Sequence, residues 1–212
     1  MGFVPSPKPA NRVRLTSAAR RAQLVDLGVE LLRTRPLDQL SLEDVATAAG
    51  ISRALPFHYF ATRADFLVAV VSASSDRLLA ATDTDPALAP AERVRLGLLG
   101  YIDYIEANAE SYIALVRGAA GANEELVAVF DSTREALVGR ILAGLGKDPS
   151  HHLIRLAARG WLGMVEEATV SWLRNPAVDR ADLVWLLNES LARIVTAAAD
   201  RHNQTSYVQA SR

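Results

Sequence analysis

Residues 49–67 have the sequence AGISRALPFHYFATRADFL, which combines a helix end, a sharp turn and the start of a second helix. Gly50 can adopt a positive φ and end the first helix. Ser52 can accept hydrogen bonds from the free N–H groups at the start of the next helix. Ile51 lies between them, where an apolar side chain fills the angle between two helices. The stretch therefore predicts a helix-turn-helix.

The helix before this turn is predicted to begin at Ser41. Ser41 and Asp44 have the spacing of a capping box, in which each side chain accepts from the backbone N–H of the other residue. The second helix contains Pro56 at about the fourth position after Ser52. Since proline has no N–H to donate where the first helical hydrogen bond would form, we expect this helix to be short or bent.

The same stretch fits a family pattern. The positions that match are Ala49, Gly50, Ile51, Ser52, Tyr59, Phe60, Thr62 and Leu67. Through them residues 15–67 resemble the N-terminal domain of the TetR family of bacterial transcriptional regulators. Three positions depart from the pattern: Pro56 replaces Leu, Phe57 replaces Tyr and Arg63 replaces Lys. Phe57 lacks the hydroxyl that the tyrosine of the family commonly offers to DNA, whereas Arg63 keeps the positive charge.

The resemblance implies DNA-binding roles for individual residues. Arg53 is the best candidate for a base contact, because two N–H groups of its guanidinium can donate to guanine O6 and N7 at the same time. Ala54 and Phe57 would contact a thymine methyl group, and His58 and Tyr59 would reach phosphates. The predicted set is completed by two capping residues and by two residues at the positive start of the following helix: Ser41, Ser52, Thr62 and Arg63. Phe57, Tyr59 and Phe60 could instead belong to the core of the small domain.

Charge is distributed unevenly along the 212-residue chain. Residues 1–63 contain nine Lys or Arg and five Asp or Glu, a net charge of +4, and the remaining residues have a net charge of −5. A basic head suits duplex DNA, because the release of counterions drives much of the binding. The chain has no cysteine, and its N-terminal residues lack the apolar core of a signal peptide. We therefore expect a cytoplasmic protein that does not enter a membrane.

Hydrophobic periodicity predicts an all-α protein. We expect a flexible basic arm over residues 1–15, a helix-turn-helix domain over 16–62, a helical ligand-binding and dimerisation domain over 63–202, and a polar tail over 203–212. Outside the helix-turn-helix pair, helices are predicted over residues 17–34, from 62 onward, and over 91–108, 110–119, 123–145, 150–175 and 180–202. Thr62 and Asp65 again have capping-box spacing, so a helix starting there would link the head to the body.

The last two predicted helices have more apolar side chains than one protomer would cover. This surplus predicts a four-helix bundle with a second copy, although a thicker core within one protomer would explain the same pattern. The resemblance implies the dimer, which would place two heads on a pseudo-palindromic operator. The predicted interface residues are Trp172, Leu173, Leu183, Leu187, Leu191 and Ile194.

The middle helices are predicted to enclose a chamber for a small apolar or amphipathic effector. Such chambers combine apolar walls with a few polar groups. The predicted lining residues are Tyr101, Tyr104, Asn108, Tyr112, Arg117, Trp161, Met164 and Glu167. Each of them could instead be an ordinary packing residue, and Glu166 and Glu167 could face solvent or the rim of the dimer.

These features predict a ligand-responsive regulator that binds a double-stranded DNA operator as a homodimer, in the first place a repressor that its effector releases. The alternative is an activator, or a helical ligand-binding protein with weak DNA binding, because Pro56 and Phe57 alter the DNA-contacting stretch. An enzyme is not expected, since no nucleophile, base and orienting group occur at a recognisable spacing. No cofactor or metal site is predicted, and His58 has no partner at the spacing of metal ligands.

Overall fold

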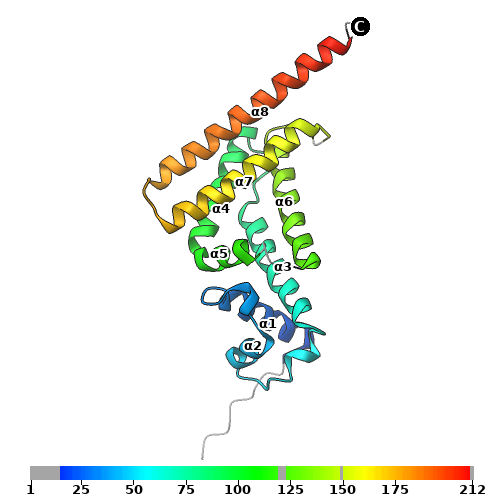
Figure 1. Cartoon of the computed structure of the whole chain (residues 1–212), viewed down its shortest axis with the longest axis vertical. Coiled ribbons are helices and arrows are strands. Elements are labelled where there is room, and N and C mark those ends of the chain that lie inside the picture. The colour runs from blue at the N-terminus through cyan, green and yellow to red at the C-terminus, as the bar shows by residue number, and fades with distance from the viewer. Residues whose placement is uncertain (1–14, 119–122, 149, 211–212) are drawn as a thin grey trace, which may run out of the picture.

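The computed structural model describes residues 15–118, 123–148 and 150–210, and it describes their side chains except at 117, 118 and 202–210. Across these ranges the secondary structure is helical and contains no strand, as predicted. The predicted basic arm lies outside the described residues, apart from its last residue. Figure 1 shows a small head around α1 (Ser17–Leu31) and α2 (Leu42–Ala49), joined by α3 (Arg63–Ala81) to a larger helical body.

The body is built from five helices: α4 (Pro90–Ala107), α5 (Ala109–Gly118), α6 (Glu124–Gly144), α7 (His152–Arg174) and α8 (Arg180–Ala210). Their bounds are close to the predicted ones, with one exception. The backbone of α8 continues past residue 202 to Ala210, where the sequence predicts a polar tail. Neither Gly nor Pro occurs after residue 202, so no residue there breaks the helix. None of the described helices is long and apolar enough to cross a bilayer.

Local sequence signals position the helices of the head. The capping box of α2 forms as predicted, with the Asp44 N–H donating to Ser41 Oγ at 3.2 Å and the Ser41 N–H donating to Asp44 Oδ2 at 3.0 Å. The capping box of Thr62 and Asp65 at the start of α3 also forms. Gly50 ends α2 at φ 64°, a conformation that a side chain would strain. The prediction that α1 reaches residue 34 is wrong, because the chain turns after residue 31 on its way to a proline.

The core of the head reaches beyond residue 62. It includes the first half of α3 and takes in Leu126 of α6. Gly28 of α1 lies so close to α3 that an added Cβ would meet Val70 Cγ2 at 2.5 Å. The absence of a side chain at Gly28 therefore permits the close packing of α1 on α3, which holds the head to the long helix.

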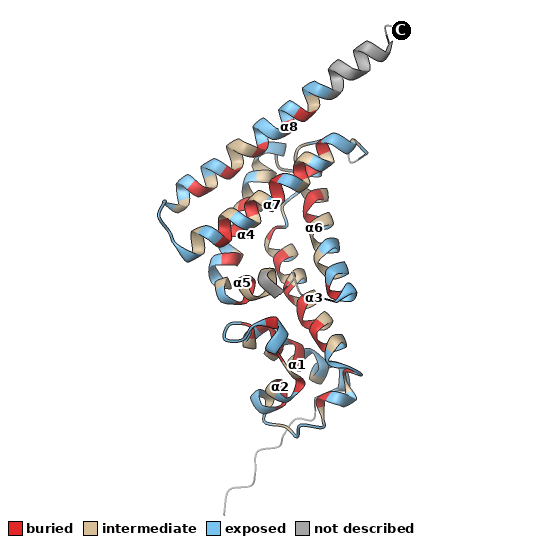
Figure 2. Ribbon diagram, viewed as in Figure 1, coloured by how far each residue is buried: buried red, intermediate tan, exposed pale blue. Residues whose placement is uncertain are grey.

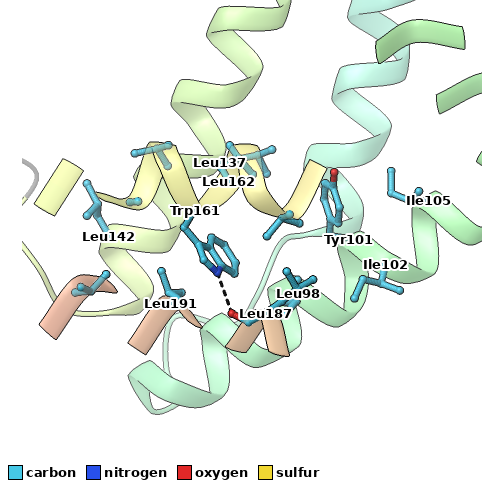
Figure 3. Packing of buried hydrophobic residues seen from close by; sticks show 14 of the residues in the cluster. Leu98, Tyr101, Ile102, Ile105, Leu137, Leu142, Trp161, Leu162, Leu187 and Leu191 are labelled. Carbon is cyan, nitrogen blue, oxygen red and sulfur yellow. Dashed lines mark hydrogen bonds between the residues drawn. The ribbon is translucent and has the colours of Figure 1, made fainter. Parts of the chain in front are cut away.

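A second core fills the body. Most of its members come from α4, α6, α7 and α8, and Figure 3 shows the Trp161 ring lying among Leu98, Leu137 and Leu162. The Trp161 indole N–H donates to the Leu187 carbonyl at 2.8 Å. This bond satisfies the polar atom of a large buried side chain and ties α7 to α8.

Candidate functional site

Residues 51–60, called here the reading segment, are folded as tight turns and a 3₁₀ helix, η2 (Pro56–His58), rather than as the predicted α-helix. The Leu55 N–H donates to the Ser52 carbonyl at 3.0 Å, which is an i+3 bond. The i+4 donor of an α-helix would be Pro56, which has no N–H, so an α-helix cannot start at this point. The prediction that the Ser52 side chain caps a helix is wrong, because Ser52 contributes its carbonyl instead.

The larger of the predicted DNA-contacting side chains that are exposed on the reading segment are Arg53, Phe57 and His58. Phe57 is 51% exposed, and Arg53 and His58 are also exposed. Phe60 points the other way, and its ring packs edge-on against Phe66 with 5.2 Å between ring centroids. Of the other predicted contacts, Ser52, Ala54 and Thr62 are exposed and Ser41 and Tyr59 are half-buried. The segment thus presents a mixed cationic and aromatic surface to the outside of the molecule.

Arg63 lies beside this surface, but its guanidinium is bound to the head. Its Nε donates to the Leu40 carbonyl at 2.8 Å, and its Nη2 donates to the Asp38 carbonyl at 2.5 Å. These carbonyls belong to η1 (Leu37–Gln39) and the residue after it. Arg63 therefore fastens the start of α3 to the head, and its predicted phosphate contact stays a prediction.

The body contains two neighbouring cavities. The junction cavity, of about 70 Å³, lies where the head meets the body and is lined by residues of α1, α3, α4, α5, α6 and α7. The Trp161 cavity, of about 60 Å³, lies between the end of α3 and helices α4, α6 and α7. Tyr101 and Leu137 line both cavities and so form the wall between them. Val29 of α1 lines the junction cavity, so an occupant there would touch the head directly.

Polar groups in the junction cavity are paired with each other. The hydroxyls of Tyr101 and Tyr112 lie 2.5 Å apart, and both side chains are buried. Arg134 holds Glu166 by a fork of two bonds, each 3.0 Å long, from Nε to Oε1 and from Nη2 to Oε2. Burial raises the pKa of the Tyr101 phenol well above its usual value, and the pKa of the Tyr112 phenol is also raised by burial. Both phenols are therefore neutral hydrogen-bonding groups near neutral pH.

Most of the predicted chamber residues line the two cavities. Tyr101, Tyr104, Asn108 and Tyr112 line the junction cavity, and Trp161 lines the other. Met164 is half-buried and packs against the body core without lining either cavity. The side chain of Arg117 lies outside the described residues.

The carboxylate at the junction cavity is Glu166, not the predicted Glu167, which is exposed. The periodicity of α7 does not distinguish these neighbours, because the decisive partner, Arg134, comes from α6. The sequence prediction also missed two arginines of the Trp161 cavity, Arg93 and Arg140. Each lies near a helix end that only the fold brings to the cavity.

The predicted dimer residues divide between the protomer core and its surface. Leu183, Leu187 and Leu191 are buried in the protomer core, so the prediction that they form an interface is wrong. They face α7 on the inner side of α8, which the apolar pattern alone could not distinguish from the outer side. Trp172 and Leu173 are half-buried against the same core, and Ile194 is 37% exposed. Figure 2 shows these alternating buried and exposed stripes along α8.

Exposed apolar residues mark a different surface on the last two helices. Leu153 and Leu156 of α7 are 40% and 66% exposed, and Trp185 and Leu186 of α8 are 65% and 46% exposed. Together with Ile194 they are called here the outer α7–α8 face. They come from opposite ends of the antiparallel pair α7 and α8, so a partner that buries them has to lie along both helices.

Two family models match the chain over most of its length. The model described as bacterial regulatory proteins of the tetR family matches residues 24–70, and the model of a tetracyclin repressor-like C-terminal domain matches residues 90–194. The chain belongs to the TetR family. Its family and fold are those of DNA-binding transcriptional regulators and not of enzymes. The exposed reading segment lies within the residues that the first of these models matches.

Individual relatives that are described as transcriptional regulators agree with this assignment. A tetR-family transcriptional regulator from Streptomyces coelicolor has a similar structure, with a TM-score of 0.80 and 26% identity, covering 91% of this chain and 87% of that one. The transcriptional activator FasR of Mycolicibacterium smegmatis is 22% identical over 170 residues, 76% of each chain. An uncharacterised HTH-type regulator of Mycobacterium tuberculosis is 25% identical over 183 residues, 78% of this chain and 72% of the relative.

Proposed function

We propose that this TetR-family regulator is a homodimeric repressor that a small effector releases from its operator. The observation that supports this most is the lining of the junction cavity, which includes Val29 of α1 and Val71 of α3 together with residues of the body. A ligand in this cavity would contact the head, the linking helix and the body at once. Binding can therefore favour one placement of the head over another.

The reading segment would provide the DNA contacts. Arg53 would contact a guanine, and Phe57 would contact a thymine methyl group. Since η2 is only three residues long, one head reaches few base edges. Two heads related by a twofold axis would read a pseudo-palindromic operator, with half-sites about 34–36 Å apart.

The outer α7–α8 face would form the dimer interface. Besides its exposed apolar side chains, it includes Gly160 and Gly163 of α7, where an added Cβ would meet no atom within 4 Å. Small residues at a helix surface allow the backbone of a second helix to come close. A partner protomer would bury Leu156 and Trp185, the two most exposed large apolar residues of this face.

Release would follow from the spacing of the two heads. An effector that binds better when the heads stand at the wrong separation lowers operator affinity by its difference in affinity for the two states. Tenfold release requires a difference of about 1.4 kcal/mol. A ligand with equal affinity for both states would release nothing.

Activation is the second candidate. It is favoured by the similarity to FasR of Mycolicibacterium smegmatis, whose name describes a transcriptional activator, at 22% identity. An activator would use the same reading segment and dimer, and would differ only in where its operator lies relative to the promoter. The sign of regulation therefore has to be measured on a promoter.

The experiment is a mobility-shift assay on the DNA upstream of the chain's own gene, combined with sedimentation of the complex and a transcription reporter on the bound fragment. We expect two protomers per site and reduced transcription. Leu156→Glu should give monomers and lose operator binding, while Val127→Glu, at an exposed apolar position on α6, should change neither. Increased transcription would select the activator, and a variant Leu156→Glu that still dimerises would refute the proposed interface.

A further inference from the structure

The Trp161 cavity changes from polar to apolar between its surface and its interior. Its half-buried lining includes Thr84, Arg93 and Arg140, whereas its buried lining includes Trp161 and Val165. The other buried lining residues are Thr82, Leu98, Tyr101, Leu137 and Leu162. An occupant that suits both ends has one charged or polar head and an apolar body.

The charge of this cavity is positive. Arg93 and Arg140 are its only charged lining residues in the described part of the chain, and none of the lining residues is acidic. The carboxylate of Asp83 lies 3.8 Å from Arg140 Nη2, but the Asp83 side chain is 76% exposed. Water therefore screens that pair, and the two guanidinium groups favour an anion at the half-buried end.

Both guanidinium groups are held in place by helix ends. Arg140 Nη1 donates to the Leu79 carbonyl and to Thr82 Oγ1, near the end of α3. Arg93 Nη1 donates to the Ala143 carbonyl near the end of α6 at 3.3 Å. Groups fixed in this way lose little freedom when a ligand binds.

One donor of Arg93 lacks a partner. Its Nε is buried, and it makes no hydrogen bond to any described residue. A buried donor on a charged group that stays unsatisfied is costly. The unsatisfied atom belongs to a residue that lines the cavity.

We propose that the Trp161 cavity binds an anionic amphiphile. A carboxylate or phosphate head would lie between Arg93 and Arg140, and a slender apolar chain would lie against Trp161, Leu162 and Val165. The wall of Tyr101 and Leu137 separates this site from the junction cavity, so the chain of a bound molecule presses on a residue pair that both cavities share. This inference rests on the proposed effector role of the body: it gives the chemical class of an effector that would bind in the Trp161 cavity and act on the junction cavity through the shared wall of Tyr101 and Leu137.

The test uses the full chain without DNA and four probes with the same six-carbon chain: hexanoate, hexyl phosphate, 1-hexanol and hexylamine. Binding is measured by calorimetry and by the tryptophan fluorescence of the unchanged chain, in which Trp161 is the indole at the cavity. We expect one of the two anions to bind about tenfold or more tightly than hexanol. Which anion binds better identifies the head group, and hexylamine should bind worst.

Arginine variants locate the head. Arg93→Gln and Arg140→Gln should each weaken anion binding about tenfold or more and leave hexanol binding unchanged. Arg95→Gln is the matched control, because Arg95 is exposed on the same helix and pairs with Glu92. If loss of a helix-end contact unfolds a Gln variant, Arg93→Lys and Arg140→Lys are used in place of the Gln variants. Each Lys variant should still bind the anion more tightly than it binds hexanol.

Equal binding of the anions and hexanol, unchanged anion binding by the arginine variants, or binding of none of the four probes would each overturn the proposed site. A second measurement, operator affinity with and without the bound anion, separates this outcome from a failure of the proposed function. If the anion binds through Arg93 and Arg140 but leaves operator affinity unchanged, the site stands and the release mechanism fails. If the operator is released by a ligand that ignores both arginines, the release mechanism stands and this site assignment fails.

Discussion

The reading segment and the junction cavity differ in whether their polar side chains already have hydrogen-bond partners within the protein. On the reading segment, Arg53 and His58 are exposed, and backbone bonds such as that from the His58 N–H to the Leu55 carbonyl fold the segment. In the junction cavity, Tyr101 is bonded to Tyr112, and the guanidinium of Arg134 is bonded to a carboxylate. The first region keeps polar groups for an external partner, whereas the second satisfies them internally.

This difference indicates where mutations should affect function and where they should affect stability. An exposed side chain with no internal contact contributes little to folding, so its loss should change only binding. A paired side chain in a half-buried cavity leaves its partner unsatisfied when it is removed, so its loss should change folding first. A ligand for the junction cavity must also replace existing bonds, which demands better complementarity than a surface contact does.

Glu166→Ala should have the largest effect on stability. The Glu166 and Arg134 side chains are only 19% and 32% exposed, so removing the carboxylate leaves a partly buried guanidinium without its partner. We expect a loss of about 2 kcal/mol of unfolding free energy, below the range for fully buried pairs because water still reaches Arg134. Urea unfolding of the pure protein measures it.

The double variant Arg134→Leu/Glu166→Leu is the control for this interpretation. Because it removes both charges together, it should cost less than Glu166→Ala alone. If the double variant is the less stable of the two, the pair contributes packing rather than charge balance, and the contrast between the two regions weakens.

Arg53→Ala should show the opposite behaviour. We expect a loss of about 1–3 kcal/mol in operator binding, with relaxed preference at one base position, and a change in unfolding free energy within about 0.5 kcal/mol. Binding to a set of operator variants at fixed salt measures the first quantity, and urea unfolding measures the second. Arg95→Ala, at an exposed arginine on α4, should leave both unchanged. Unaltered base preference in Arg53→Ala would refute a direct contact between Arg53 and a base.

Local signals predicted the helices of this fold well. The capping pairs at Ser41 and Thr62 and the glycine at residue 50 act within one turn of chain, so their effect can be inferred from the sequence alone. Pro56 was also an informative local signal, although its effect proved greater than a bend. The missing N–H prevents the α-helix from starting, and the segment folds as a 3₁₀ helix instead.

Pairings between distant helices could not be predicted in this way. Leu187 and Ile194 lie on one apolar helix, but only the position of α7 determines that the first is buried and the second partly exposed. The cavity carboxylate is Glu166 because Arg134 on α6 reaches it across 32 residues of sequence. The sequence therefore predicted the residue types of the chamber, while the identity of the paired residues depended on tertiary packing.

The smallest expected effect concerns the two phenols of the junction cavity. Burial raises the pKa of both Tyr101 and Tyr112, so the folded chain keeps both protons above pH 10 while the unfolded chain releases them. The stability that this contributes is fully present below about pH 10 and falls as the pH rises from there towards the folded-state pKa. At pH 10 the loss should be about 0.4 kcal/mol for each phenol. Unfolding free energies of the wild type and of Tyr101→Phe/Tyr112→Phe, compared between pH 8 and 10, measure it. Equal pH slopes would mean that the phenols ionise as easily in the folded as in the unfolded chain, and that the cavity admits solvent like the surface around the reading segment.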